Sequence, residues 1–238
     1  MKAYREAKII ENKNIGPGIY LMKVDLTMDA VPGQFIMLRS SDFSGSPILS
    51  RPFGIVDIEE DGLSLLYQVK GNGTELMKTY KPGDIVNILG PLGNGFDLVQ
   101  DKKIAVVAGG IGIAPLLYLV KNLKDKVDFY AGFSDEEYFT YAFKPYVEKI
   151  VTTIDKVDKI FITDAINPDD YDIIYACGPN PMLYNLARKT KNAKLYVSME
   201  SHMACGIGAC LGCTIKNRKG DFVRVCKDGP VFDAKEVF

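Results

Sequence analysis

The sequence predicts an antiparallel β-barrel, then an α/β domain with a doubly wound parallel sheet, then a small cysteine-rich lobe. Three observations indicate this order. Residues 1–99 carry short apolar runs behind Pro–Gly turns, and residues 100–197 carry continuous apolar runs followed by helical patterns. Residues 198–238 hold four of the five cysteines. We therefore expect three units in this chain of 238 residues, with these boundaries.

The barrel is predicted from period-two patterns and turn signals. Residues 20–26 alternate between two faces, and residues 62–70 supply another strand. Pro32–Gly33 and Pro82–Gly83 each stand ahead of a short apolar run. Many short strands at about ten-residue spacing are typical of a small antiparallel barrel.

The α/β domain is predicted from apolar runs that alternate with helical patterns. The expected strands lie at residues 103–108, 127–131 and 172–177. A glycine-rich loop and a helical pattern over residues 116–120 follow the first strand. After the last strand, we expect Asn180 as the N-cap of a helix and Pro181 as its first residue.

The cysteine spacing indicates a metal cluster. Cys205, Cys210 and Cys213 form C-x4-C-x2-C, and Cys226 follows after twelve residues, a spacing typical of plant-type [2Fe–2S] centres. Four-cysteine zinc sites more often pair two C-x2-C units, so zinc is the alternative. Disulfides are disfavoured because three cysteines within nine residues cannot pair off comfortably.

Composition and charge exclude several classes of protein. The formal net charge is −1, so nothing indicates a nucleic acid or an anionic membrane as partner. No apolar run reaches the roughly 18 residues of a membrane span, and the N-terminus lacks a signal-peptide core. Thiolate ligands beside an unpaired thiol fit a reducing compartment, so we expect a cytoplasmic protein.

Two stretches of the barrel are candidates for phosphate binding. Arg51 precedes Pro52, which holds an extended backbone, and its guanidinium can donate two hydrogen bonds to a pyrophosphate. Gly73 and Thr74 open a short helical pattern, and a helix N-terminus preceded by glycine attracts phosphate. A surface Arg–Pro pair and an ordinary turn with Thr74 as N-cap are the alternatives.

Two loops at the carboxyl ends of the expected parallel strands are candidates for dinucleotide binding. Residues 109–112 lack the spacing of the standard dinucleotide fingerprint, so we interpret them as a nucleotide loop of another type. Cys177 ends the later strand, either as a small buried residue or as a thiol in a nicotinamide pocket. Residues 132–137 are acidic and lack Arg and Lys, which favours NAD over NADP.

No catalytic side chain is predicted. The chain has one histidine, His202, which we interpret as structural because four cysteines already complete the cluster. A Ser–His–Asp constellation therefore has no support. The chemistry must come largely from cofactors.

The order of the motifs resembles the ferredoxin–NADP reductase superfamily. These motifs are R-P-F-G at 51–54, G-P-L-G-N-G-F at 90–96, G-G-x-G-x-A-P at 109–115 and C-G-P-x-P-M at 177–182. Two further stretches make the resemblance more specific: S-M-E-x-x-M-A-C-G-I-G-A-C-x-x-C at 198–213 and V-C-K-D-G-P-V-F-D-A at 225–234. They are similar to the electron-transfer subunits of class 1B, NAD-dependent dihydroorotate dehydrogenases, and the resemblance covers essentially the whole chain.

The resemblance implies a role for each motif. The residues implied in FAD binding are Arg51, Pro52, Phe53, Gly54, Leu66, Tyr67, Gln68, Gly73 and Thr74. The residues implied in NAD binding are Gly109, Gly110, Gly112, Cys177, Gly178 and Pro179, and the implied cluster ligands are the four cysteines. Gly54 departs from the serine usual in the family, and Gln68 departs from a basic residue that is often found there.

The resemblance further implies an oxidoreductase that works with a partner. A separate FMN-containing catalytic subunit would oxidise dihydroorotate, and electrons would pass through the cluster and FAD of this chain to NAD⁺. Two copies of each subunit would form a heterotetramer, with the cysteine loop near their interface. The alternatives are a related reductase subunit that serves ferredoxin, sulfide or polysulfide, and a non-enzymatic nucleotide-binding module stabilised by zinc.

Overall fold

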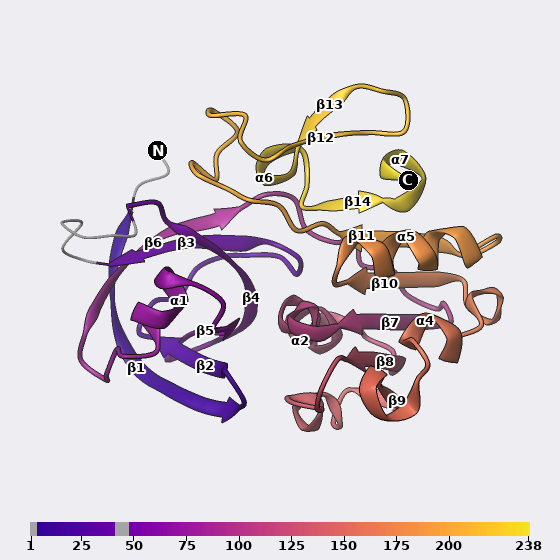
Figure 1. The fold of residues 1–238 in the computed structure, drawn as a ribbon, viewed down its shortest axis with the longest axis horizontal. Coiled ribbons are helices and arrows are strands. Elements are labelled where there is room, and N and C mark those ends of the chain that lie inside the picture. The colour runs from indigo at the N-terminus through magenta and orange to yellow at the C-terminus, as the bar shows by residue number, and fades with distance from the viewer. Residues whose placement is uncertain (1–3, 41–47) are drawn as a thin grey trace.

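The computed structural model describes residues 4–40 and 48–238. It contains a barrel, a sheet flanked by helices, and a C-terminal segment that extends over both (Figure 1). The fold class predicted from the sequence is confirmed, although residues 1–3 and 41–47 of the expected barrel lie outside the described part. No helix within the described ranges is long and apolar enough to span a membrane.

The barrel is closed and all its pairings are antiparallel, in the order β1-β2-β5-β4-β3-β6. Its strands are β1 (Arg5–Gly16), β2 (Ile19–Val24), β3 (Phe35–Ser40), β4 (Arg51–Glu59), β5 (Gly62–Gln68) and β6 (Ile85–Leu92), and α1 (Asn72–Met77) follows β5. The alternating faces of β2 and β5 place Met22, Val24, Leu63 and Leu65 in the interior, where they are fully buried.

The second sheet has the order β14-β11-β10-β7-β8-β9. Its strands are β7 (Ile104–Gly109), β8 (Val127–Phe133), β9 (Val147–Ile154), β10 (Ile173–Cys177), β11 (Lys194–Ser198) and β14 (Val231–Asp233). Five of them are parallel, as predicted, and β14 joins the edge antiparallel to β11. The helical segments between the strands are η1 (Gly110–Ile113), α2 (Ala114–Asn122), η2 (Thr140–Phe143), α3 (Asp155–Asp158), α4 (Ile162–Ala165), η3 (Pro168–Asp170) and α5 (Asn180–Lys189).

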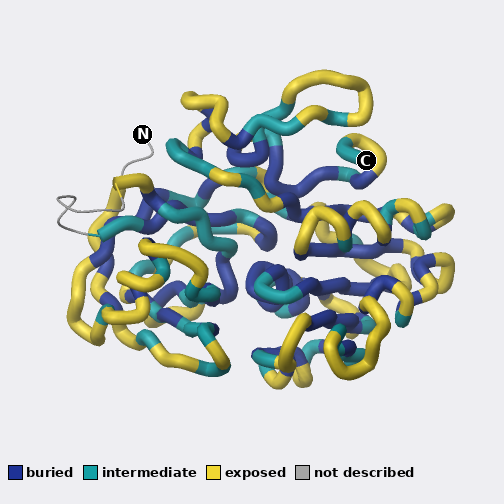
Figure 2. The backbone as a smooth tube through the Cα atoms, in the orientation of Figure 1, coloured by how far each residue is buried: buried dark blue, intermediate teal, exposed yellow. Residues whose placement is uncertain are grey.

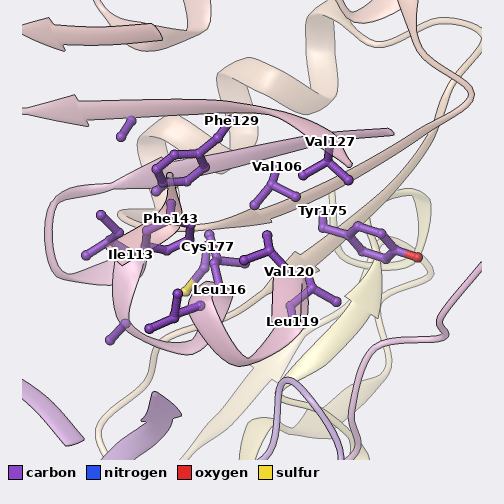
Figure 3. Close-up of a cluster of buried hydrophobic side chains, with 14 of the residues drawn as sticks. Val106, Ile113, Leu116, Leu119, Val120, Val127, Phe129, Phe143, Tyr175 and Cys177 are labelled. Carbon is purple, nitrogen blue, oxygen red and sulfur yellow. The ribbon is translucent and has the colours of Figure 1, made fainter. Parts of the chain in front are cut away.

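Helices pack on both faces of this sheet because its central strands are apolar on both sides. Along β7, Val106 and Ala108 belong to the core that includes the apolar side chains of α2 (Figure 3). The intervening residues Ala105 and Val107 belong to a second core with Leu183 of α5. The run at 103–108 is therefore continuously apolar because the strand is covered on both faces, as the sequence predicted.

The start of α5 differs from the prediction by one residue. Its N-cap is Pro179, with φ −58° and ψ 139°, and Asn180 is already helical. Pro181 still lies in the first turn, where its missing N–H costs no hydrogen bond. Asn180 was therefore wrongly assigned as the N-cap.

The C-terminal segment is tied to both the barrel and the sheet. It contains β12 (Thr214–Lys216), β13 (Phe222–Arg224), α6 (Val225–Asp228), β14 and α7 (Ala234–Val237). One buried cluster combines Met37 of the barrel, Val197 of the sheet and Cys226 of α6, and the tube is dark blue where these parts meet (Figure 2). A Cβ on Gly206 would lie 2.6 Å from Met37, so the first cysteine loop packs tightly on β3.

Candidate functional site

Two cavities meet where the barrel faces the carboxyl ends of the parallel strands. The smaller has a volume of about 290 Å³ and the larger a volume of about 850 Å³. Residues from the barrel, from η1 and from the segment after β11 line both of them: Gln68, Lys70, Ile111 and Glu200. A ligand in one cavity would therefore lie next to a ligand in the other.

The smaller cavity contains most of the residues implied in FAD binding. These are Pro52, Phe53, Gly54, Leu66, Tyr67 and Gln68, contributed by β4 and β5. On the opposite side lie Cys177 and the segment that leaves β11, including Met199 and Met203. Such a slot, with apolar walls and a few polar groups, suits a flat ring system.

The remaining FAD candidates lie together at the start of α1. A Cβ on Gly73 would lie 2.7 Å from Nε of Arg51, so only glycine leaves the guanidinium its place against this turn. The Thr74 hydroxyl accepts hydrogen bonds from the backbone N–H groups of Lys70 (2.9 Å) and Gly71 (3.2 Å). The N-cap of α1 is Gly71, and Thr74 is the third residue of the helix. The alternative interpretation of Thr74 as the N-cap is therefore wrong. Arg51 and this turn form a cradle of suitable chemistry for a pyrophosphate.

The residues implied in NAD binding divide between the two cavities. Gly109, Gly110 and Pro179 line the larger cavity, and Cys177 lines the smaller one. Gly112 and Gly178 line neither. A Cβ on Gly112 would lie 2.4 Å from the carbonyl oxygen of Cys177, so this glycine allows the two loops to approach each other.

Cys177 is a neutral buried thiol. It is 3% exposed and lies among the apolar side chains around α2 (Figure 3). Burial raises the pKa of this thiol, the nearby Glu200 carboxylate raises it further, and the hydroxyl of Ser198 only partly offsets both. Cys177 packs as a small buried residue and lines the wall of the smaller cavity, and a role in a nicotinamide pocket stays a prediction.

Glu200 and Lys70 are functional candidates that the sequence reasoning did not single out. Both line the junction of the two cavities. The surrounding protein raises the pKa of the Glu200 carboxyl, although its side chain is exposed to cavity space, and the Lys70 ammonium partly opposes this shift. Glu200 belongs to the S-M-E motif, but only the fold brings it near Lys70.

The far wall of the larger cavity is acidic and carries one exposed aromatic ring. Asp135, Glu136 and Asp155 line it, together with Phe161, which is 59% exposed. Lys156 forms an ion pair with Asp135. The run 132–137 lacks basic residues, as noted from the sequence, but the fold brings a lysine from α3 to it.

A buried hydroxyl in this wall has no hydrogen-bond partner among the described residues. Thr163 is 1% exposed, its Oγ1 is unpaired, and the residue lines the larger cavity. Native proteins rarely leave a buried hydroxyl unpaired, but this oxygen has almost no accessible surface, so it does not by itself indicate a ligand. The volume of about 850 Å³ and the exposed ring of Phe161 make the cavity suitable in size and chemistry for a nucleotide.

The four cysteines fall into two pairs. The backbone N–H of Cys210 donates to Sγ of Cys205 at 3.4 Å, and the backbone N–H of Cys226 donates to Sγ of Cys213 at 3.4 Å. Within the described residues, no trio of Cys, His, Asp or Glu side chains is arranged to hold a single metal ion. Two thiolates on each of two irons is the arrangement of a four-cysteine [2Fe–2S] cluster, so the paired sulfurs favour this cluster over one zinc ion.

Backbone N–H groups point at the sulfurs of both pairs. Gly208 donates to Sγ of Cys226 at 3.1 Å, and Cys226 donates to Sγ of Cys213 at 3.4 Å. Burial opposes ionisation of Cys205, but the N–H groups of Ile207, Cys210 and Ala209 outweigh it and lower the pKa of this thiol to about 6. These N–H groups thus favour the thiolate of Cys205, whereas burial and the neighbouring Cys213 raise the pKa of Cys226 to about 12.

Comparisons with known proteins agree with this site. Residues 200–238 match a family model described as the iron-sulfur cluster binding domain of dihydroorotate dehydrogenase B. The chain is 43% identical to the electron transfer subunit of dihydroorotate dehydrogenase B (NAD(+)) from Clostridium acetobutylicum, with 98% of this chain and 97% of the relative covered. The subunit of the same name from Caldanaerobacter subterraneus is 41% identical, with 100% of this chain and 99% of the relative covered.

A solved structure shares the whole fold. The structure of an NADH-dependent reduced ferredoxin-NADP oxidoreductase, described in work on flavin-based electron bifurcation, matches with a TM-score of 0.86 and 24% identity. The match covers 98% of this chain and 89% of that chain. From the full-length identity to its relatives, the chain belongs to the family of electron transfer subunits of dihydroorotate dehydrogenase B (NAD(+)).

Proposed function

We propose that this chain passes electrons from the FMN-containing catalytic subunit of a dihydroorotate dehydrogenase to NAD⁺, through a [2Fe–2S] cluster and FAD. One observation carries the proposal. The segment from Ser198 to Met203 lines the smaller cavity and leads directly into Cys205, while the smaller cavity shares four residues with the larger one. The three expected sites thus form one continuous row, as a relay needs.

The chain's own residues would hold each cofactor. Arg51 and the turn at Gly73 would bind the FAD pyrophosphate, and β4 and β5 would seat its ring system. The wall around Phe161 would bind the adenosine half of NAD. The nicotinamide half would then lie near Gly109 and Pro179, which line the same cavity. FAD supplies the chemistry that joins a one-electron cluster to a two-electron carrier.

The partner would dock at the cysteine loop. Cys210 is exposed, and its neighbours Ile207 and Leu211 expose 49% and 62% of their surface. Apolar side chains of this size beside a cluster ligand support a protein contact at this point. We propose two copies of each subunit in the cytoplasm, where the thiol-rich site would stay reduced before it binds iron.

The test is an anaerobic visible spectrum of the chain co-purified with its catalytic subunit. Dihydroorotate should bleach the flavin and cluster bands, and NAD⁺ should restore them. Bleaching by NADH but not by dihydroorotate would support an NADH-linked flavin reductase and would contradict dihydroorotate as the electron donor. A colourless protein that contains zinc would overturn the proposal as a whole.

A further inference from the structure

Arg224 holds the α6 side of the cysteine site together. It ends β13, and its backbone N–H donates to Asp228 Oδ2 at 2.8 Å. Its Nε donates to the same oxygen at 3.0 Å, and its Nη2 donates to Oδ1 at 3.0 Å. These bonds close one turn around Cys226, and they leave Nη1 free to face the other cysteine loop.

That remaining nitrogen reaches the loop of the first three cysteines. Nη1 of Arg224 donates to the carbonyl oxygen of Gly208 at 3.3 Å. The N–H of Gly208 donates to Sγ of Cys226. The carbonyl that Arg224 binds belongs to the peptide between Gly208 and Ala209, and the N–H of that same peptide faces Cys205. A single guanidinium contact therefore fixes peptides that point at sulfurs of both cysteine pairs.

The guanidinium also places a positive charge near the buried pair. The guanidinium, which is protonated at any ordinary pH, forms an ion pair with Asp228 at 3.0 Å and interacts with the sulfurs of Cys226 and Cys213. Reduction adds one negative charge to an iron–sulfur cluster. Nearby positive charge and N–H groups aimed at sulfur stabilise the reduced form more than the oxidised form.

We propose that Arg224 is a positioning residue that orients the cysteine loop through Gly208 and raises the reduction potential of the bound cluster. The proposal rests on the cluster assigned under the proposed function. A cluster that is easier to reduce accepts electrons more readily from the catalytic subunit, so Arg224 would favour that step of the relay.

The experiment compares Arg224→Gln and Arg224→Lys with the wild-type chain in complex with its catalytic subunit. Iron and sulfide content, visible circular dichroism and the midpoint potential of the cluster are measured under anaerobic conditions. Arg218→Gln is the matched control, because Arg218 is exposed in the same segment and its removal causes the same change in net charge.

We expect Arg224→Gln to retain iron and to shift the midpoint potential to a more negative value. At a fixed solution potential, the ratio of reduced to oxidised cluster should fall by about tenfold, which for a one-electron couple is about 59 mV. Arg224→Lys keeps the charge but lacks the planar fork of three nitrogens that donate to both Asp228 oxygens and to Gly208, so it should show a smaller shift and an altered dichroism spectrum. Arg218→Gln should match the wild type.

Two results would overturn the inference. One is an Arg224→Gln cluster with the wild-type potential and spectrum. The other is loss of iron in Arg224→Gln together with an Arg224→Lys variant that matches the wild type, because a positive charge alone would then suffice and the bonds to Asp228 and Gly208 would not orient the loop or set the potential. A wild-type chain without iron would instead contradict the proposed function, so the two failures are distinguishable.

Discussion

Gly54 of β4 lies directly against Pro115 of α2. A Cβ built on Gly54 would be 3.0 Å from Cβ of Pro115, closer than side-chain carbons normally approach. This contact joins the strand that lines the smaller cavity to the helix that covers the sheet. A serine, as the resemblance implies for this position, has no room unless Pro115 shifts by a few tenths of an ångström. Packing between the two units thus accounts for the glycine.

We predict that Gly54→Ser destabilises the protein by about 1 kcal/mol, because it forces apart a well-packed contact. The matched control is Gly54→Ala, which adds the same Cβ without the hydroxyl. Thermal melts of the FAD-free protein should show equal losses for both variants. If a hydroxyl at this position contacts the flavin, FAD should bind more tightly to the serine variant than to the alanine variant. Melts that match the wild type would show that Pro115 gives way freely.

A second contact between the same two units is an ion pair. Lys121 of α2 and Asp57 of β4 form a salt bridge in which the side chains are only 25% and 12% exposed. Asp57→Asn leaves a half-buried ammonium without its counter-charge, so we expect a loss of about 2 kcal/mol in the free energy of unfolding. Asp164→Asn, which breaks the more exposed pair with Lys189, should cost well under about 1 kcal/mol. Chemical denaturation at pH 7 would measure both.

The same pair predicts an alkaline loss of stability. Burial disfavours the charge of Lys121, but the hydrogen bond and the charge of Asp57, with smaller contributions from Tyr146 and Glu59, together outweigh it, and the pKa of Lys121 is raised above 10.5 in the folded chain. A lysine with a raised pKa stabilises the fold below its unfolded pKa, and this contribution is lost as the pH rises through the folded pKa. The difference in stability between wild type and Asp57→Asn should therefore shrink above about pH 10.5. A constant difference up to pH 12 would contradict the assignment.

Features within one stretch of sequence were predictable, and features that depend on long-range contacts were not. The spacing from Cys205 to Cys226 indicated the cluster because its ligands follow one another along the chain. The strand β9 went unrecognised because its residues mix charged and apolar types at the edge of the sheet. The strand β14 has only three residues, and only pairing with β11 makes it a strand.

The same distinction separates the site residues. Gly73 could be singled out because a glycine at the start of a helix has a local meaning, but its contact with Arg51 of β4 comes only from the fold. Glu200, Lys156 and Phe161 carry no local signal. These residues indicate a binding site only once the fold places them in or beside the wall of one cavity.

Phe161 is predicted to stack on the adenine of NADH. Its ring lines the larger cavity and remains 59% exposed, so a planar base can cover it. Stacking of a base on an aromatic ring contributes about 1–3 kcal/mol, so Phe161→Ala should raise the Kd for NADH by about tenfold. Val157→Ala is the control, since Val157 is 69% exposed on the preceding helix and does not line the cavity. Titration of NADH fluorescence gives both constants, and equal constants would remove Phe161 from the site.

Asp135 is predicted to set the preference for NADH over NADPH in two ways. Its carboxylate lines the larger cavity, where it repels a 2′-phosphate, and it also occupies the ammonium of Lys156. Asp135→Asn removes the repulsion and releases a lysine that is 73% exposed at the same wall. We therefore expect the affinity for NADPH to rise by about tenfold, while the affinity for NADH changes little.

The double variant Asp135→Asn/Lys156→Gln separates the two effects. If the released lysine binds the phosphate, the gain in NADPH affinity should largely disappear in the double variant, because only the repulsion has then been removed. If the gain persists, repulsion by Asp135 alone discriminates between the nucleotides. An unchanged ratio of NADPH to NADH affinity in Asp135→Asn would show that the 2′ position lies away from this wall. In that case the adenosine half could not follow the path from Phe161 to Gly109 that the cavity offers.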